Sequence, residues 1–199
     1  MELINYIPLL VIWAGGVVFF RANKIWVFYF LWGAIGFTVL AAFMLQGTII
    51  ETTLSRTAIK VITYFNAVMK IPVMPFADVG TMLMTGTLMS GYTSLEIGTE
   101  CSGLLEGAVF WGLTLFYPVF NLKKKLETLI IGSMLIYFVN LLRVQLIVTA
   151  IFLGGRNTIF VAHTILGRGV FFLMMIVLYW FFFTRRTLFF IDRQSSLEG

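Results

Sequence analysis

Long apolar runs separated by short polar breaks dominate the chain. A hydrocarbon core about 30 Å thick is crossed by roughly 20 residues of α-helix. The stretches that approach this length are 3–20, 25–45, 104–120, 126–153 and 159–183. They predict an all-α membrane protein, a bundle of about five transmembrane helices. The third stretch is short for a span, so we expect its helix to begin earlier, near Glu100 or Cys101.

The segment between the second and third runs has a different pattern. Within 51–70, apolar residues recur every three or four positions from Leu54 to Met69, which predicts an amphipathic helix on the membrane surface. Residues 71–75 contain two prolines and are expected to break it. The stretch 80–97 is rich in Thr, Ser, Met and Gly, with Gly91 near its middle, and this favours a β-hairpin.

Charge separates the polar breaks into two sets. One set is rich in cations, namely Arg21, Lys24, Lys123, Lys124, Lys125, Arg185, Arg186 and Arg193. The other mixes both signs, with Arg56, Lys60, Lys70 and Arg156 beside Glu51, Asp78, Glu96 and Glu100. Because cytoplasmic loops are enriched in Lys and Arg, we expect a plasma-membrane protein with its N-terminus outside and its C-terminus inside.

This orientation divides the chain into four parts. We expect two N-terminal membrane helices in 1–46, an extracytoplasmic helix and hairpin in 47–99, and a three-helix core in 100–184. Residues 185–199 are expected to form a cytoplasmic tail, and its last five residues have the composition of a linker. The chain begins with an acidic residue, Glu2, so the first run is expected to be a retained helix rather than a cleaved signal peptide.

Composition excludes several classes of function. The chain is 60% hydrophobic and 12% charged, against roughly 25% charged in soluble domains, so its partner is the lipid bilayer. The net charge of +5 is concentrated in the breaks, which is a topology signal rather than a nucleic-acid footprint. With one cysteine the chain cannot form an internal disulfide. One cysteine and one histidine also cannot complete a closed metal site without carboxylate ligands. We expect no metal and no cofactor.

Ionisable residues inside membrane spans are costly, so each is a functional candidate. Cys101 lies at the outer start of the third run, Asn140 and Arg143 in the outer half of the fourth, and His163 about one turn into the fifth. All fall at one depth. A thiol, an imidazole and a guanidinium at one level form a candidate acyl-transfer site, with a thiolate nucleophile, a histidine acid/base and an arginine that stabilises the thiolate or the oxyanion.

Glu106 and Arg168 are expected to support this site. Each lies five residues below Cys101 or His163, about 7–8 Å deeper in the membrane. We expect Glu106 to pair with Arg143, with Arg168 or with both.

Backbone N–H groups at the helix start supply a further candidate element. Those of Ser102 and Gly103 could donate to an oxyanion. Asn140 is one turn before Arg143 on the same face and is expected to orient the arginine or a substrate carbonyl.

Three positions in order resemble a known family. Glu100-Cys101-Ser102-Gly103 opening a helix, Asn140 and Arg143 on the next, and His163 near the start of the last resemble the exosortase/archaeosortase family. More narrowly, the chain is similar to its small Gram-positive type over roughly 46–183, although many relatives have more spans.

The resemblance implies a membrane cysteine transpeptidase or protease. Its substrates would be secreted proteins with a C-terminal sorting signal, consisting of a short motif, a transmembrane helix and a basic tail. The enzyme would cleave near the motif and transfer the new C-terminus to an acceptor at the outer face. Cys101 would be the nucleophile, His163 the general acid/base and Arg143 the transition-state stabiliser.

Two other classes of function remain open from the residues alone. A single cysteine in a membrane helix is most often an apolar filler, and buried arginines and histidines often only bond helices together. On that interpretation the protein is a non-enzymatic scaffold. A small transporter is less favoured, because the charges are confined to the outer half and the chain has no inverted repeat.

Overall fold

The computed structural model describes residues 7–75, 82–88, 91–97 and 101–184. Within them the α-helices are α1 (Ile7–Ala22), α2 (Trp26–Leu45), α3 (Ile49–Val68), α4 (Leu104–Phe116), α5 (Leu122–Gly154) and α6 (Arg168–Tyr179). The strands are β1 (Val73–Pro75), β2 (Met82–Gly86) and β3 (Tyr92–Glu96). A short 3₁₀ turn, η2 (Arg156–Thr158), and two π-helical segments, η3 (Val161–Gly167) and η4 (Trp180–Thr184), complete the described elements.

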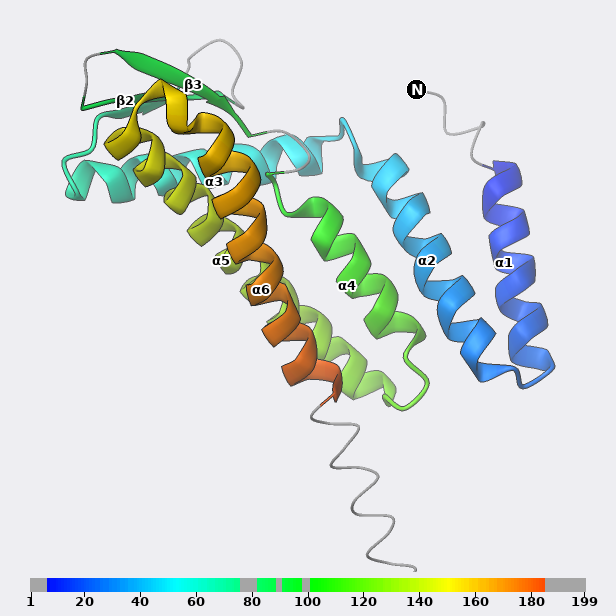
Figure 1. Ribbon diagram of the computed structural model, residues 1–199. Coiled ribbons are helices and arrows are strands. Elements are labelled where there is room, and N and C mark those ends of the chain that lie inside the picture. The colour runs from blue at the N-terminus through cyan, green and yellow to red at the C-terminus, as the bar shows by residue number, and fades with distance from the viewer. Residues whose placement is uncertain (1–6, 76–81, 89–90, 98–100, 185–199) are drawn as a thin grey trace, which may run out of the picture.

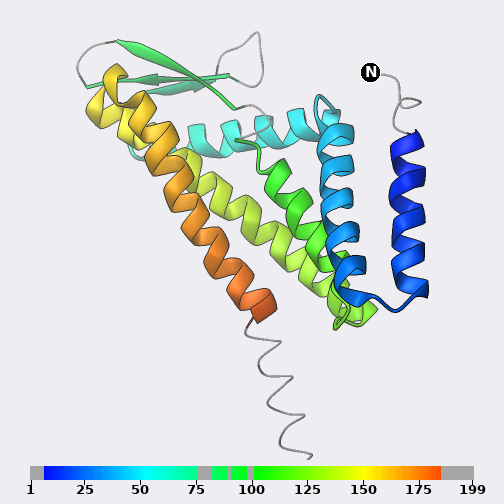
Figure 2. The same cartoon turned by 45° about the vertical axis from the view of Figure 1, so that its right-hand side comes forward.

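The architecture is a group of apolar helices capped at one end by a layer of α3 and the sheet. Figures 1 and 2 show α3 crossing the ends of α4 and α5, with the sheet beyond it. We call this the sheet end. Within the described part of the chain, three helices are long and apolar enough to cross a membrane, namely Trp26–Leu45, Leu122–Gly154 and the continuous helix Val161–Thr184. The protein is therefore predominantly helical and suited to a bilayer, while the count of five spans stays a prediction.

The shorter apolar helices α1 and α4 have 16 and 13 residues. The expectation that the third helix begins near Glu100 or Cys101 is wrong at Cys101, because Cys101–Gly103 form a turn and α4 begins at Leu104. Gly103 has a φ of 76°, a left-handed conformation that an α-helix does not continue through. The helix ends before Pro118, where Tyr117 is extended, as is usual for the residue before a proline.

The segment between α2 and α4 largely follows its predicted pattern. The expected amphipathic helix is α3, which buries a face that includes Ala58, Ile59 and Ile62. The expected hairpin is β2 and β3, which pair antiparallel from Met82↔Glu96 to Gly86↔Tyr92.

The predicted break at 71–75 adds a strand that the sequence pattern did not indicate. Its residues form β1, whose Val73 pairs with Thr85 of β2, so the sheet has the order β1-β2-β3. Prolines are tolerated in such an edge strand because one side of its ladder needs no partner.

Buried apolar side chains form two clusters. The sheet-side cluster joins α3, the sheet, α5 and η3 around Cys101, and includes Ile62, Leu83, Ile97 and Ile147. The aromatic cluster lies between α4, α5 and the last helix, and consists of Phe110, Ile136, Phe171, Met175, Leu178 and Phe182. The predicted tail 185–199 and Glu100 lie outside the described residues.

Candidate active site

Cys101 lies in the turn before α4, beneath the sheet. It is only 2% exposed and belongs to the sheet-side cluster, together with Leu83 and Ile97. The thiol is therefore shielded from water, which its place at the outer end of an apolar run did not predict. The sheet and α3 cover this position, which would be exposed to water at the end of a membrane helix that lacked such a cover.

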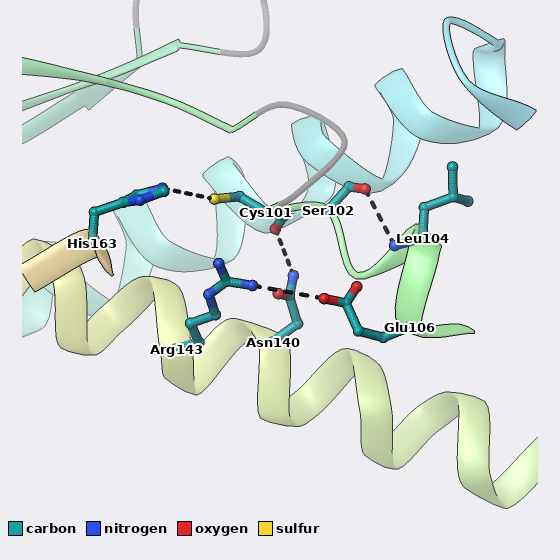
Figure 3. Close-up of polar contacts among 7 residues, drawn as sticks. All are labelled: Cys101, Ser102, Leu104, Glu106, Asn140, Arg143 and His163. Atoms are coloured by element: carbon teal, nitrogen blue, oxygen red, sulfur yellow. Dashed lines mark hydrogen bonds and ion pairs between the residues drawn. The ribbon is translucent and has the colours of Figure 1, made fainter. Parts of the chain in front are cut away.

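His163 contacts the thiol directly. The Cys101 Sγ and the His163 Nε2 are 3.5 Å apart (Figure 3). This is within the range of a sulfur hydrogen bond. In one imidazole tautomer Nε2 accepts the thiol proton, and in the doubly protonated ring it donates to a thiolate. The structure thus joins two residues 62 positions apart in the chain.

A π-helical turn carries the histidine. His163 is the third residue of η3, which passes into α6 without a break at Arg168. The wide turn packs tightly on α5, since a side chain at Gly167 would meet Ile147. Single π turns within helices frequently mark functional sites, because they redirect one side chain without ending the helix.

Asn140 holds the backbone that carries the nucleophile. Its Nδ2 donates to the Cys101 carbonyl oxygen over 2.7 Å, and its side chain is fully buried. Its expected role in orienting Arg143 or a substrate carbonyl stays a prediction. Gly103 eases this approach, because a Cβ there would lie 3.3 Å from the Asn140 side chain, closer than most Cβ contacts.

Arg143 is buried on the same face of α5. It is 4% exposed, its Nη1 lies 3.8 Å from the Glu106 Oε1, and its guanidinium carbon is 5.1 Å from the centre of the Phe171 ring. The expected pairing with Glu106 therefore forms. Figure 3 shows the guanidinium between the Cys101–His163 pair and Glu106.

The remaining predicted residues lie around this centre. Ser102 Oγ accepts from the Leu104 N–H over 3.3 Å, and Gly103 is the N-cap residue of α4. Arg168 lines one cleft with Glu106 and Arg143. All eight predicted site residues therefore gather where α4, α5 and η3 meet.

Two contributions were missed at the sequence level. Phe171 supports the Arg143 guanidinium, and nothing in an apolar run distinguishes that phenylalanine from its neighbours. Asn66 and Gln145 bind each other through both amides at 2.9 Å and join α3 to α5. The signal for Gln145 was present, since it is a polar residue inside an apolar stretch.

Among the described residues, no group of three or more His, Cys, Asp or Glu side chains could hold a metal ion. Comparisons with protein-family models, curated proteins and solved structures found no match to this chain.

Proposed function

We propose that the protein is a membrane-embedded cysteine peptidase or transpeptidase whose nucleophile is Cys101. The observation that carries this proposal is the 3.5 Å contact between Cys101 Sγ and His163 Nε2. These are the one cysteine and the one histidine of the chain, and they come from different elements. A nucleophile within reach of its base is the basic requirement for covalent acyl transfer.

The reaction follows from the positions of the groups. The thiol proton passes to His163, and the sulfur attacks the scissile carbonyl carbon to form a tetrahedral oxyanion. Collapse breaks the C–N bond, and His163 returns its proton to the leaving amine. A thioester on Cys101 remains. An acceptor nucleophile then attacks this thioester, losing its proton to His163, and the thiol is regenerated.

Arg143 is the cation that would stabilise the oxyanion or the thiolate. Its contacts with Glu106 and Phe171 fix the guanidinium before any substrate binds. A donor held in place in a site with little water stabilises developing charge without having to reorganise. Backbone N–H groups of Ser102 and Gly103 are further candidate donors at the turn.

The substrate class comes from the resemblance and from topology. We infer secreted proteins whose C-terminal signal includes a membrane helix. Such a helix could dock sideways against the bundle and bring its motif to the sheet end, where confinement to the membrane raises the effective concentration. The charge distribution favours a plasma-membrane protein with the sheet end outside, the N-terminus outside and the C-terminus inside.

The cover over the thiol has a consequence for the outcome of the reaction. Leu83 and Ile97, both fully buried, belong to the cluster that surrounds Cys101. Water is therefore kept away from the sulfur, which favours transfer to an acceptor over hydrolysis. The cover must also shift for a peptide to enter.

Burial of Cys101 is the observation that favours the alternative, a scaffold in which the thiol only fills space. The two functions differ in whether the sulfur reacts. The test compares host cells that produce the wild-type protein with cells that produce the Cys101→Ala or the His163→Ala variant. Mass spectrometry of protein C-termini then identifies secreted proteins that have lost a terminal membrane helix.

We expect processed C-termini in wild-type cells and a loss of at least ~10³-fold with Cys101→Ala, because removing a nucleophile can cost about 10⁶-fold in rate. Thr114→Val is the matched control, because it changes a buried polar residue of α4 far from the sheet end and should leave processing intact. Identical C-termini with and without the thiol would exclude the peptidase and leave the scaffold.

A further inference from the structure

A cleft lies between α4 and α6, beside the Arg143–Glu106 pair. Its volume is about 690 Å³, and its lining includes Leu105 and Glu106 of α4, Arg143 of α5, and Arg168 and Phe172 of α6. Figure 2 shows α5 passing between α4 and α6. The volume is within the range of ligand sites, roughly 300–1,000 Å³.

The charges that line the cleft are mainly positive. The described lining residues carry two guanidinium groups, of Arg143 and Arg168, and one carboxylate, of Glu106. Arg143 is buried and faces Glu106, whereas Arg168 is exposed within the continuous helix Val161–Thr184, which is long enough to span a membrane. Two guanidinium groups against one carboxylate leave the cleft with a net positive charge, which complements an anionic ligand.

The rest of the cleft is apolar and open at the side. Leu105 and Phe172 are 43% and 65% exposed, and Met175 also lines the space. Gly169 contributes an opening, because nothing lies within 4 Å of a Cβ built on it. A ligand that fits these walls has an anionic group and an apolar chain.

We propose that this cleft binds an anionic phospholipid from the leaflet at the sheet end. Its phosphate lies against the Arg168 guanidinium, with Arg143 behind, and one acyl chain follows Leu105, Phe172 and Met175. A planar guanidinium group can donate two parallel hydrogen bonds to two oxygens of one phosphate. A lipid is favoured over a soluble anion because apolar side chains form most of the walls. The binding does not require Cys101 to be a nucleophile.

Native mass spectrometry of the purified full-length protein in detergent tests this site. Phosphatidylglycerol and phosphatidylcholine are titrated separately, and the bound adducts are counted. We expect phosphatidylglycerol to bind more tightly. Arg168→Gln should weaken its binding about tenfold, the effect of losing one charge-assisted contact, while Arg168→Lys retains most of the binding. Arg56→Gln removes an exposed arginine from α3, outside the cleft, and is the charge-matched control.

Gly169→Leu tests the apolar part while both arginines are kept. The new side chain should occupy the cleft and weaken phosphatidylglycerol binding, whereas Gly15→Leu, at an equally open glycine on α1, should not. Inorganic phosphate should fail to displace the lipid. The proposal is overturned by equal binding of the two lipids, by phosphatidylglycerol binding that Arg168→Gln weakens no more than Arg56→Gln does, or by displacement with phosphate alone.

Discussion

The two ends of the helical bundle are packed by different means. Around Cys101, the interior holds polar side chains that are almost fully buried, including Asn66, Asn140 and Arg143. Toward the other end, the aromatic cluster is held by edge-to-face ring contacts, such as Phe110 with Phe182 at 5.6 Å. A buried polar group loses free energy unless a hydrogen-bond partner is correctly placed, whereas aromatic rings pack in several favourable arrangements, edge-to-face and offset-stacked. The sheet end is therefore the half in which side-chain directions are specified.

Glycine serves the two halves differently as well. In the aromatic half, Gly132 admits the Phe110 ring, which a Cβ would overlap. At the sheet end, Gly103 admits the Asn140 amide and adopts a left-handed conformation. One glycine improves packing and the other positions a hydrogen bond to the candidate nucleophile.

Removing Arg143 should have the largest effect on stability. Arg143→Met takes away the cation that the Glu106 carboxylate faces, and breaking a buried ion pair costs roughly 3–5 kcal/mol. Because the Glu106 side chain is 21% exposed, we expect about 3 kcal/mol, at the lower end of that range, measured by unfolding with SDS in mixed micelles. Adding Glu106→Gln should restore much of the loss. A loss below about 1 kcal/mol, the level of an exposed pair, would show that the pair does not organise this half.

The link between α3 and α5 should come next. Gln145→Leu leaves the buried Asn66 Oδ1 without its 2.9 Å donor, which costs about 2 kcal/mol. The double variant with Asn66→Leu removes both amides and should be more stable than the sum of the single losses predicts. Unfolding free energies of the four proteins measure this coupling. Strictly additive losses would contradict a shared contact.

The smallest effect is expected in the aromatic half. Thr114 is fully buried, and its hydroxyl has no hydrogen-bond partner among the described residues. Thr114→Val keeps the shape and removes the polar atom, so we expect a gain of up to about 1 kcal/mol. The same unfolding assay checks it. A marked loss of stability would mean that this half also depends on a polar network.

Much of this arrangement could be predicted from the pattern of residues. The helical spacing of apolar residues predicted α3. The run of small and polar residues around Gly91 predicted the hairpin of β2 and β3. The common depth of Cys101, Arg143 and His163 predicted that they would meet. This worked because helices in a membrane run roughly parallel, so depth is readable from position along each span.

Other features depend on tertiary contacts that the pattern does not encode. Strand β1 forms in a proline-containing break only because β2 offers it a partner. Cys101 is buried because a sheet from a separate part of the chain covers it. The π-helical turn at His163 likewise has no compositional signature that distinguishes it from an α-helical turn.

The π turn also allows the last membrane helix to have two independent faces. Each residue of an α-helix turns the side-chain direction by about 100°. In an uninterrupted α-helix, the direction of the His163 side chain would therefore be fixed relative to that of Arg168 below it. The wide turn of η3 uncouples them. The imidazole therefore points toward the Cys101 sulfur, while the rest of the helix keeps its own orientation toward lipid and toward α5.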